Sequence, residues 1–535
     1  MKNKGFTLVE LLAVIILLSI IALIAVPKVL EQKEKKEKEI SLAKKKVLYS
    51  DAEKYLKENN EDDITPGQEF CISVETLINE GYISMDADDL KNETVKVTVD
   101  NNSNLVSSLS NNCSGDIVIG GYKEEILYGA DPVLKSDMVP VTIANDGTIK
   151  RASTLSEWYN YGNKKWANVV VLLDDTRYKV GDSIPEEKIK AYYVWIPRYK
   201  YKLFDNTTES SIDIVFENDK TTKSSSTTPG QYLTHPAFTY GNQELNGFWV
   251  GKFEPSVETS DACYTTANKT NCNKELTNPR IKPNVTSLRY QQVLNQFKTS
   301  KNVSVNSRMM KNDEWGAVAY LSHSAYGLNG KVRINNGINR ITGCGAFSAD
   351  SLGYVVGCQI KYGKATEYPQ STTGNITGIF DTSGGDWEYM MAVRADSSGL
   401  PLSGKHNLYN SGFNGKFGSP GSDSSDSSIL ELTSGINYPE SKEFNLYDNP
   451  SDRNNITETN GCNGNACYGH AMNEFRKASG GNGSWYGEYS DFVSMERPFV
   501  KRGGDYSEGA KAGVFAFGNS FGNYNAFISF RVVVR

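Results

Sequence analysis

The organisation of this chain is decided at its start, where residues 1–30 read MKNKGFTLVELLAVIILLSIIALIAVPKVL. From Phe6 to Val26 nearly every residue is apolar, and the one carboxylate is Glu10. A helix over this run would be about 30 Å long, which matches the hydrocarbon core of a bilayer. The run is therefore predicted to span a membrane. Its acid needs an explanation, because a charge in hydrocarbon costs about 3 kcal/mol or more.

The flanks of the apolar run favour an anchor that is retained. A secretory signal peptide has a shorter apolar core and a small-residue cleavage site, whereas Pro27 and a charged segment follow here. Lys2 and Lys4 favour a cytoplasmic N-terminus, which places the rest of the chain outside the membrane. Glu10 then either lies at the headgroup edge or meets a cation, since a buried anion is tolerated when it is paired.

The stretch KGFTLVELL, residues 4–12, resembles the leader of type IV prepilins and pseudopilins. In that family a dedicated peptidase cleaves after the glycine, and the new N-terminal residue is methylated. The resemblance implies processing between Gly5 and Phe6, and pairing of Glu10 with the N-terminal amine of a neighbouring subunit in a filament. The implied partners are other pilin subunits, the prepilin peptidase and the inner membrane. An ordinary membrane anchor is the alternative.

Beyond the leader, residues 1–5, the segment 6–60 is predicted to form a transmembrane and spine helix. Its outer part has mixed-sign charges at helical spacing. Ile40, Ala43 and Val47 mark an apolar stripe that could pack on a globular head.

Two β-rich regions are predicted next. Residues 61–125 contain FCISVETLINEGYIS and VKVTVD, which are interpreted as short strands of a small pilin head. Residues 126–190 are predicted to be a connecting module. Within it, MVPVTIANDGTIKRA alternates around an Asn-Asp-Gly turn, and WANVVVLLDD is typical of a buried strand.

Six short stretches follow one another in residues 191–535. They are VWIPRYKYKL, LNGFWVGKFE, KNDEWGAVAYL, NITGIFDTSGGDWEYM, VKRGGDY and FISFRVVVR. Their order resembles the formylglycine-generating-enzyme family, a variant of the C-type lectin fold, with departures at Gly385-Asp386 and at Ser529-Phe530. The predicted fold class is thus α+β: a long N-terminal pilin helix, a small β-rich head and a large C-type-lectin-like domain.

Catalysis is not expected from this domain. The family's enzymes use two cysteines in the last part of the domain, and the last cysteine here is Cys467. Zinc-protease, serine-hydrolase and P-loop motifs are also missing. The calcium motifs of lectins are absent. Structural calcium on loop carboxylates stays open, its position is unknown, and no other cofactor is predicted.

Eight cysteines fall into local pairs by proximity. An even count beyond a membrane segment favours disulfides in an oxidising space, although spacing does not fix connectivity. The alternative is metal ligands or free thiols, but there is no CxxC pair and only four scattered histidines. The predicted pairs are Cys71 with Cys113, Cys263 with Cys272, Cys344 with Cys358, and Cys462 with Cys467.

Composition adds two constraints. The 30 Tyr, 21 Phe and 47 Gly favour β-rich domains with many turns. The net charge of -6 and the absence of a basic cluster interleaved with aromatics argue against a nucleic-acid partner.

The segment 503–531 reads GGDYSEGAKAGVFAFGNSFGNYNAFISFR and is rich in the Tyr, Ser, Gly and Asn that binding loops use. In the lectin-like fold, the corresponding segment forms an exposed face. The alternative is an aromatic core strand with loops, and alternation predicts that Phe530 and Val532 are core. The candidate ligand-binding residues are Asp505, Tyr506, Phe515, Phe517, Asn519, Phe521, Asn523, Tyr524, Asn525 and Phe527.

The variable proteins of diversity-generating retroelements share this fold, and their variable residues lie in the same segment. Most residues from Val514 to Ser529 are reachable from an asparagine codon by changing adenines alone. These likenesses predict a type IV pilin-like subunit, minor or at the tip because filament packing limits head volume. Its precursor would lie in the cytoplasmic membrane and its mature form on an extracellular filament or the cell surface.

The predicted role is adhesion or recognition through an extracellular protein or glycan ligand that the sequence does not identify. The alternatives are a pseudopilin of a secretion or DNA-uptake machine and a tethered enzyme of the formylglycine-generating type.

Overall fold

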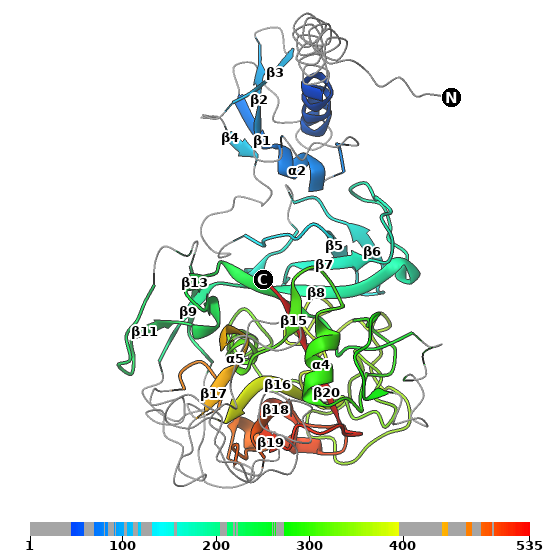
Figure 1. Cartoon of the computed structure of the whole chain (residues 1–535), viewed down its shortest axis with the longest axis vertical. Helices are drawn as coiled ribbons and strands as arrows, with labels where there is room; N and C mark the ends of the chain where they lie inside the picture. The colour runs from blue at the N-terminus through cyan, green and yellow to red at the C-terminus, as the bar shows by residue number, and fades with distance from the viewer. Residues whose placement is uncertain are drawn as a thin grey trace, which may run out of the picture. The chain divides into compact units, whose positions relative to one another are not determined.

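A computed structural model places two compact units along the chain, Met1–Gly120 and Gly121–Arg535 (Figure 1). The residues it describes are 44–57, 69–79, 81–83, 90, 93–100, 104–110, 116–118, 131–154, 158–203, 211–217, 220, 223–258, 261, 263, 272–394, 441–447, 467–472, 483–494 and 497–535.

The first unit combines a helix with a four-stranded sheet of order β3-β2-β1-β4. Residues 44–57 are helical. Neighbouring strands are antiparallel except for β1 and β4, which are parallel. The elements are β1 Glu69–Ser73, α2 Val74–Asn79, β2 Thr94–Val99, β3 Leu105–Leu109 and β4 Asp116–Val118.

The helix at 44–57 buries a face different from the predicted stripe. Val47 is 44% exposed, so its prediction was wrong, and Ile40 and Ala43 lie outside the described residues. The buried face repeats at i, i+4, i+7 and i+8, as an amphipathic helix requires. The helix also meets β3, where the hydroxyl of Tyr49 accepts a hydrogen bond from the Leu109 amide. The buried residues are Leu48, Ala52, Tyr55 and Leu56.

The stretch FCISVETLINEGYIS is only partly a strand, which corrects the sequence interpretation. Its first residues form β1, but α2 begins at Val74. Ser73 explains the change, because its hydroxyl accepts a hydrogen bond from the Thr76 amide at 3.0 Å and so caps the new helix. VKVTVD forms β2 as predicted.

The second unit is built on a seven-stranded antiparallel sheet of order β15-β21-β14-β8-β7-β5-β6. The hairpin of β5 and β6 around the Asn-Asp-Gly turn and the buried strand β7 are confirmed. Because β7 pairs with β8, the predicted boundary between 126–190 and 191–535 does not separate two compact units. The strands are β5 Met138–Ile143, β6 Ile149–Arg151, β7 Asn168–Leu172, β8 Ile189–Pro197, β14 Gly247–Gly251, β15 Ser307–Met309 and β21 Val532–Val534.

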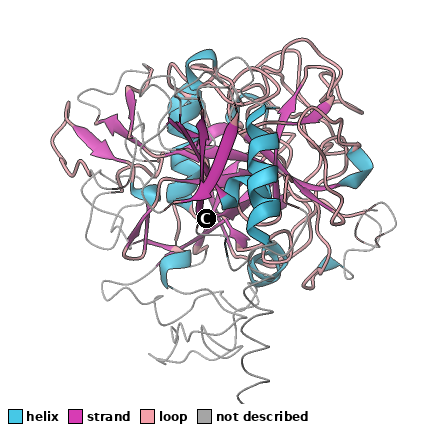
Figure 2. Ribbon diagram, turned by 90° about the horizontal axis from the view of Figure 1, so that it is seen from above, coloured by secondary structure: helices cyan, strands magenta, loops and turns pink. Residues whose placement is uncertain are grey.

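A second sheet of five strands carries the segment of interest near the C-terminus, in the order β17-β16-β18-β19 with β20 paired to β16. Loops connect most elements of this unit (Figure 2). The sheet consists of β16 Trp387–Arg394, β17 Asn445–Tyr447, β18 Phe499–Gly503, β19 Gly513–Ser520 and β20 Ile528–Phe530.

Smaller elements complete the second unit. Two small sheets are formed by β9 Tyr199–Lys202, β10 Ile214–Phe216 and β11 Tyr232–Thr234, and by β12 Thr239–Tyr240 and β13 Gln243–Glu244. The α-helices are α4 Val293–Ser300 and α5 Asn312–Ser322. The short 3-10 helices are η3 Tyr161–Asn163, η4 Glu186–Lys188, η5 Pro236–Phe238, η8 Ser441–Glu443, η10 Trp485–Gly487 and η11 Gly509–Lys511.

The helical stretch DEWGAVAYL lies in α5, which is buried on every side. Gly316 allows this packing, because a Cβ there would lie 1.8 Å from the carbonyl oxygen of Gly469. Phe530 and Val532 are fully buried, as predicted.

Five of the six quoted stretches are linked around Trp315 and Arg531 in the core. The guanidinium carbons of Arg502 and Arg531 lie 5.8 and 5.9 Å from its ring. Arg531 forms a buried ion pair with Glu388, with Nε donating to a carboxylate oxygen at 2.8 Å. It also donates to the carbonyl oxygen of Gly251 at 2.8 Å. A buried pair of this kind is stable only when the remaining donors are satisfied, as these contacts ensure.

Two of the predicted disulfides are confirmed, Cys263–Cys272 and Cys344–Cys358. Cys71 and Cys467 are also disulfide-bonded, and their predicted partners Cys113 and Cys462 lie outside the described residues. Within the described ranges, no group of three or more His, Cys, Asp or Glu side chains is arranged to hold a metal ion.

The predicted membrane span, residues 6–26, lies outside the described residues. None of the helices that the structure does describe has the length and apolar character needed to cross a bilayer.

Candidate functional site

Two glycine turns meet at the base of the predicted binding segment. The amide of Gly384 donates to the carbonyl oxygen of Gly503 at 3.1 Å, and the carbonyl oxygen of Gly385 accepts from the Tyr506 amide at 3.0 Å. All three glycines have φ between 73° and 89°, a conformation that side chains disfavour. The turns therefore fix the position from which Tyr506 projects.

Arg340 lies against two aromatic rings from this segment. Its guanidinium carbon is 4.4 Å from the ring centroid of Tyr506 and 5.0 Å from that of Phe527. The two rings are stacked, with centroids 6.4 Å apart and planes 19° from parallel. Tyr354 adds a third ring, edge-on to Tyr506 at 5.8 Å. Cation–π contacts of this kind hold the side chains in one arrangement.

The buried carboxylate of Asp386 forms an ion pair with Arg340. Nε of Arg340 lies 2.8 Å from an oxygen of Asp386, which also accepts a hydrogen bond from the Ser287 hydroxyl. Burial raises the pKa of Asp386, while Arg289 and Arg340 act against that shift. Asp386 therefore positions Arg340.

Two exposed apolar side chains flank Tyr354 in the chain. Leu352 and Val356 are 90% and 86% exposed, and Tyr354 is also exposed. They lie in the loop closed by the disulfide Cys344–Cys358, and Leu352 lies beside Gly509. We call Arg340, Leu352, Tyr354, Val356, Tyr506 and Phe527 the aromatic face.

The structure divides the predicted binding residues into two groups. Tyr524 and Phe527 are 48% and 40% exposed. Tyr506, Phe521, Asn523 and Asn525 are partly exposed. The buried residues are Asp505, Phe515, Phe517 and Asn519.

Burial of Phe515, Phe517 and Asn519 follows from their position on β19, which is buried along its whole length. The Phe515 ring packs edge-on against Trp485 at 4.9 Å, and its amide donates to Glu488 at 2.8 Å. Burial raises the pKa of Glu488 to about 8. Asn519 donates to the carbonyl oxygen of Phe492. These three side chains belong to the core, so their prediction as surface contacts is corrected.

The loop 521–527 is anchored by its backbone. The carbonyl oxygen of Asn525 accepts from the Tyr290 amide at 3.0 Å, and that of Phe527 accepts from the Trp387 amide at 2.9 Å. The side-chain oxygen of Asn525 accepts from the Phe527 amide at 2.8 Å. Asn525 is thus a positioning residue for Phe527 rather than a free contact.

Sequence reasoning missed Arg340, Leu352, Tyr354 and Val356. A signal for the last three is present in the sequence, since SLGYVVG places apolar residues beside two glycines inside a loop bounded by two cysteines. Such a loop is too short to bury them in a core of its own. Arg340 has no comparable signal.

The processing and assembly residues Gly5, Phe6 and Glu10 lie outside the described residues. Residues 1–26 match the family described as the prokaryotic N-terminal methylation motif. No protein of curated function matches the chain. The chain therefore carries a prepilin-type N-terminus, which implies pilin subunits and a prepilin peptidase as partners.

Proposed function

We propose that this chain, with its prepilin-type N-terminus, is a minor or tip subunit of a type IV pilus that displays a recognition domain. The methylation motif at residues 1–26 supports the filament part of this proposal. The order of the six stretches in the larger unit supports a C-type-lectin-like domain. The resemblance to retroelement variable proteins supports only the location of the binding surface. The exposed side chains of Tyr524 and Phe527 lie in the segment that corresponds to the variable residues of those proteins.

The aromatic face is the observation that supports a recognition role for the larger unit. Monomeric proteins rarely expose contiguous apolar surface without an interaction to explain it. Tyr is also among the residues that dominate binding energy at protein interfaces, and the buried Arg340 holds the rings of Tyr506 and Phe527 in place. Leu352 and Val356 offer apolar area without hydrogen-bonding groups, which suits a protein ligand better than a glycan rich in hydroxyls.

The proposed role is binding without turnover. Every cysteine among the described residues is disulfide-bonded, so none of these can supply the thiolate that formylglycine chemistry requires. Conversion of a sulfatase-type cysteine peptide to its aldehyde by the full chain would overturn this part of the proposal.

Truncating Phe527 is expected to weaken ligand binding at least about tenfold, because the change removes an anchor ring and loosens Arg340. A photoreactive residue at Leu352, on filaments at the cell surface, would first cross-link the ligand. Affinity of the purified ligand for the full chain would then be compared between the native chain and Phe527→Ala.

Leu173→Ala is the matched control, since Leu173 is a comparably exposed apolar residue outside the aromatic face. It should leave the affinity unchanged. Equal affinity of the native chain, Phe527→Ala and Tyr506→Ala would show that the ligand binds elsewhere.

A further inference from the structure

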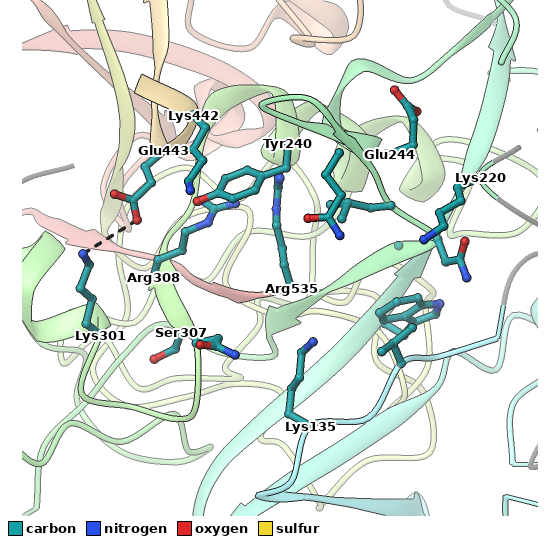
Figure 3. A pocket seen from close by; sticks show the side chains of 17 residues that line it. Lys135, Lys220, Tyr240, Glu244, Lys301, Ser307, Arg308, Lys442, Glu443 and Arg535 are labelled. Carbon is teal, nitrogen blue, oxygen red and sulfur yellow. Dashed lines mark ion pairs between the residues drawn. The ribbon is translucent and has the colours of Figure 1, made fainter. Parts of the chain in front are cut away.

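A cavity of about 620 Å³ opens in the larger unit and shares no residue with the aromatic face. Its walls come from segments far apart in sequence, among them the residues before β5, the β12–β13 hairpin and the chain end (Figure 3). Six basic side chains line it, whereas only two glutamates do. We call it the cationic pocket, and its basic residues are Lys135, Lys220, Lys301, Arg308, Lys442 and Arg535.

Three of these cations surround a single ring. The Arg535 guanidinium carbon is 4.1 Å from the ring centroid of Tyr240, that of Arg308 is 5.0 Å away, and Nζ of Lys442 is 5.5 Å away. Figure 3 shows the three side chains converging on Tyr240. Crowding like charges around one ring is unfavourable without anions nearby.

The carboxylates close to the pocket are already engaged. Glu314, which does not line the pocket, forms ion pairs with both Arg308 and Arg535. Glu244 bonds Lys223 at 2.7 Å and Arg198 at 2.8 Å, neither of which lines the pocket. The remaining carboxylate, Glu443, lies 3.9 Å from Lys301. Positive charge therefore exceeds negative charge in the pocket.

Two basic side chains of the pocket lack partners that such groups usually have. Lys135 forms no ion pair with any described residue, and burial lowers the pKa of its ammonium group. On Arg535, whose side chain is 8% exposed, Nε and Nη1 have no hydrogen-bond partner among the described residues. Buried guanidinium donors without partners are costly, so an anion bound opposite them would be stabilised.

Neutral polar side chains also line the cationic pocket. Gln243, Asn246 and Asn306 line it beside the cations, and the side-chain oxygen of Asn246 is buried without a hydrogen-bond partner. Amide groups in a cavity suit the hydroxyls of a sugar, and the volume lies in the usual range for small-molecule sites.

We propose that the cationic pocket binds a saccharide bearing a carboxylate or sulfate group. Basic side chains would hold the acidic group, and the amides would hold ring hydroxyls. An acidic peptide fits less well, because its extended backbone needs a groove rather than a cavity lined by side-chain amides. The site is independent of the protein ligand proposed for the aromatic face.

The test is calorimetric titration of the detergent-solubilised full chain with glucuronate, glucose, glucose 6-sulfate, inorganic sulfate and a poly-glutamate peptide. We expect saturable binding of glucuronate or glucose 6-sulfate that weakens as salt is raised, with no binding of glucose and weaker binding of sulfate. The two sugar acids distinguish a carboxylate from a sulfate ligand.

Lys135→Gln combined with Lys442→Gln should weaken binding at least about tenfold, since each change removes a charge-assisted contact. Neither lysine pairs with the buried Glu314, so the fold should survive, which thermal unfolding checks. Lys361→Gln is the matched control, because it removes an exposed lysine that does not line the pocket.

Three results would overturn the proposal. The first is the absence of binding by both sugar acids, and the second is affinity that the double variant leaves unchanged. The third is binding of inorganic sulfate or a poly-glutamate peptide as tightly as the sugar acids, which would make the pocket an anion site without sugar recognition.

Discussion

Replacing Arg531 by leucine is expected to lower the free energy of unfolding of the larger unit by about 3–5 kcal/mol, the cost of leaving a buried charge without its partner. Glu388 is fully buried and its ion-pair partner is Arg531. Burial raises the pKa of Glu388 to about 7 even with the arginine present. Without the arginine that pKa rises further, so the loss should be smaller at pH 5, where the acid is protonated, than at pH 8.

Urea unfolding of the full chain, followed by tryptophan fluorescence, measures this effect cleanly. All seven tryptophans lie in the larger unit, so their signal reports on that unit alone. Lys188→Ala is the control, because it breaks an exposed pair with Asp174 and should change stability little. The double variant Arg531→Leu with Glu388→Leu should recover part of the loss. A loss for Arg531→Leu no larger than the control's would refute the proposed role of the pair.

Replacing Glu10 by alanine is expected to reduce incorporation into filaments at least about tenfold while leaving membrane insertion intact. The apolar run becomes more hydrophobic, so insertion is not impaired. The amine of the neighbouring subunit, however, loses the carboxylate that would pair with it in a low-dielectric environment. The measurement is the ratio of the chain in sheared surface filaments to that in membranes.

Glu31→Ala is the matched control for this experiment, because Glu31 lies beyond the apolar run. It should assemble as the native chain does. Normal assembly of Glu10→Ala would remove the pairing from the account and leave the carboxylate as a residue of the headgroup edge.

Local patterns predicted individual elements well and their burial poorly. Alternation and a turn motif predicted the β5–β6 hairpin and β7, because strand pairing there is local. By contrast, the composition of residues 503–531 and their resemblance to a lectin-like binding segment placed Phe515 and Phe517 at the surface. Both faces of β19 are buried. One of them is packed by Trp485 and Glu488, which lie some thirty residues earlier in the chain. Spacing within a strand carries no information on what a distant segment will cover.

The residues of the aromatic face were likewise only partly predictable from local sequence. Tyr506 and Phe527 were predicted from composition, but Arg340 and Asp386 come from two other segments and join them only through tertiary contacts. In the first unit the register of the helix at 44–57 was misjudged because Val47 and Leu48 are adjacent apolar residues, and only packing on the sheet decides which one is buried. The N-terminal motif was predictable because it is a run of consecutive residues, and residues 1–26 match the methylation-motif family.

The central claim is that the chain is processed as a prepilin, and the mass of its mature N-terminal peptide tests that claim most directly. Purified from surface filaments, the chain should begin at Phe6 with one methyl group on its amine and should lack residues 1–5. A mature chain that keeps Met1–Gly5, or that begins at any residue other than Phe6, would contradict the account.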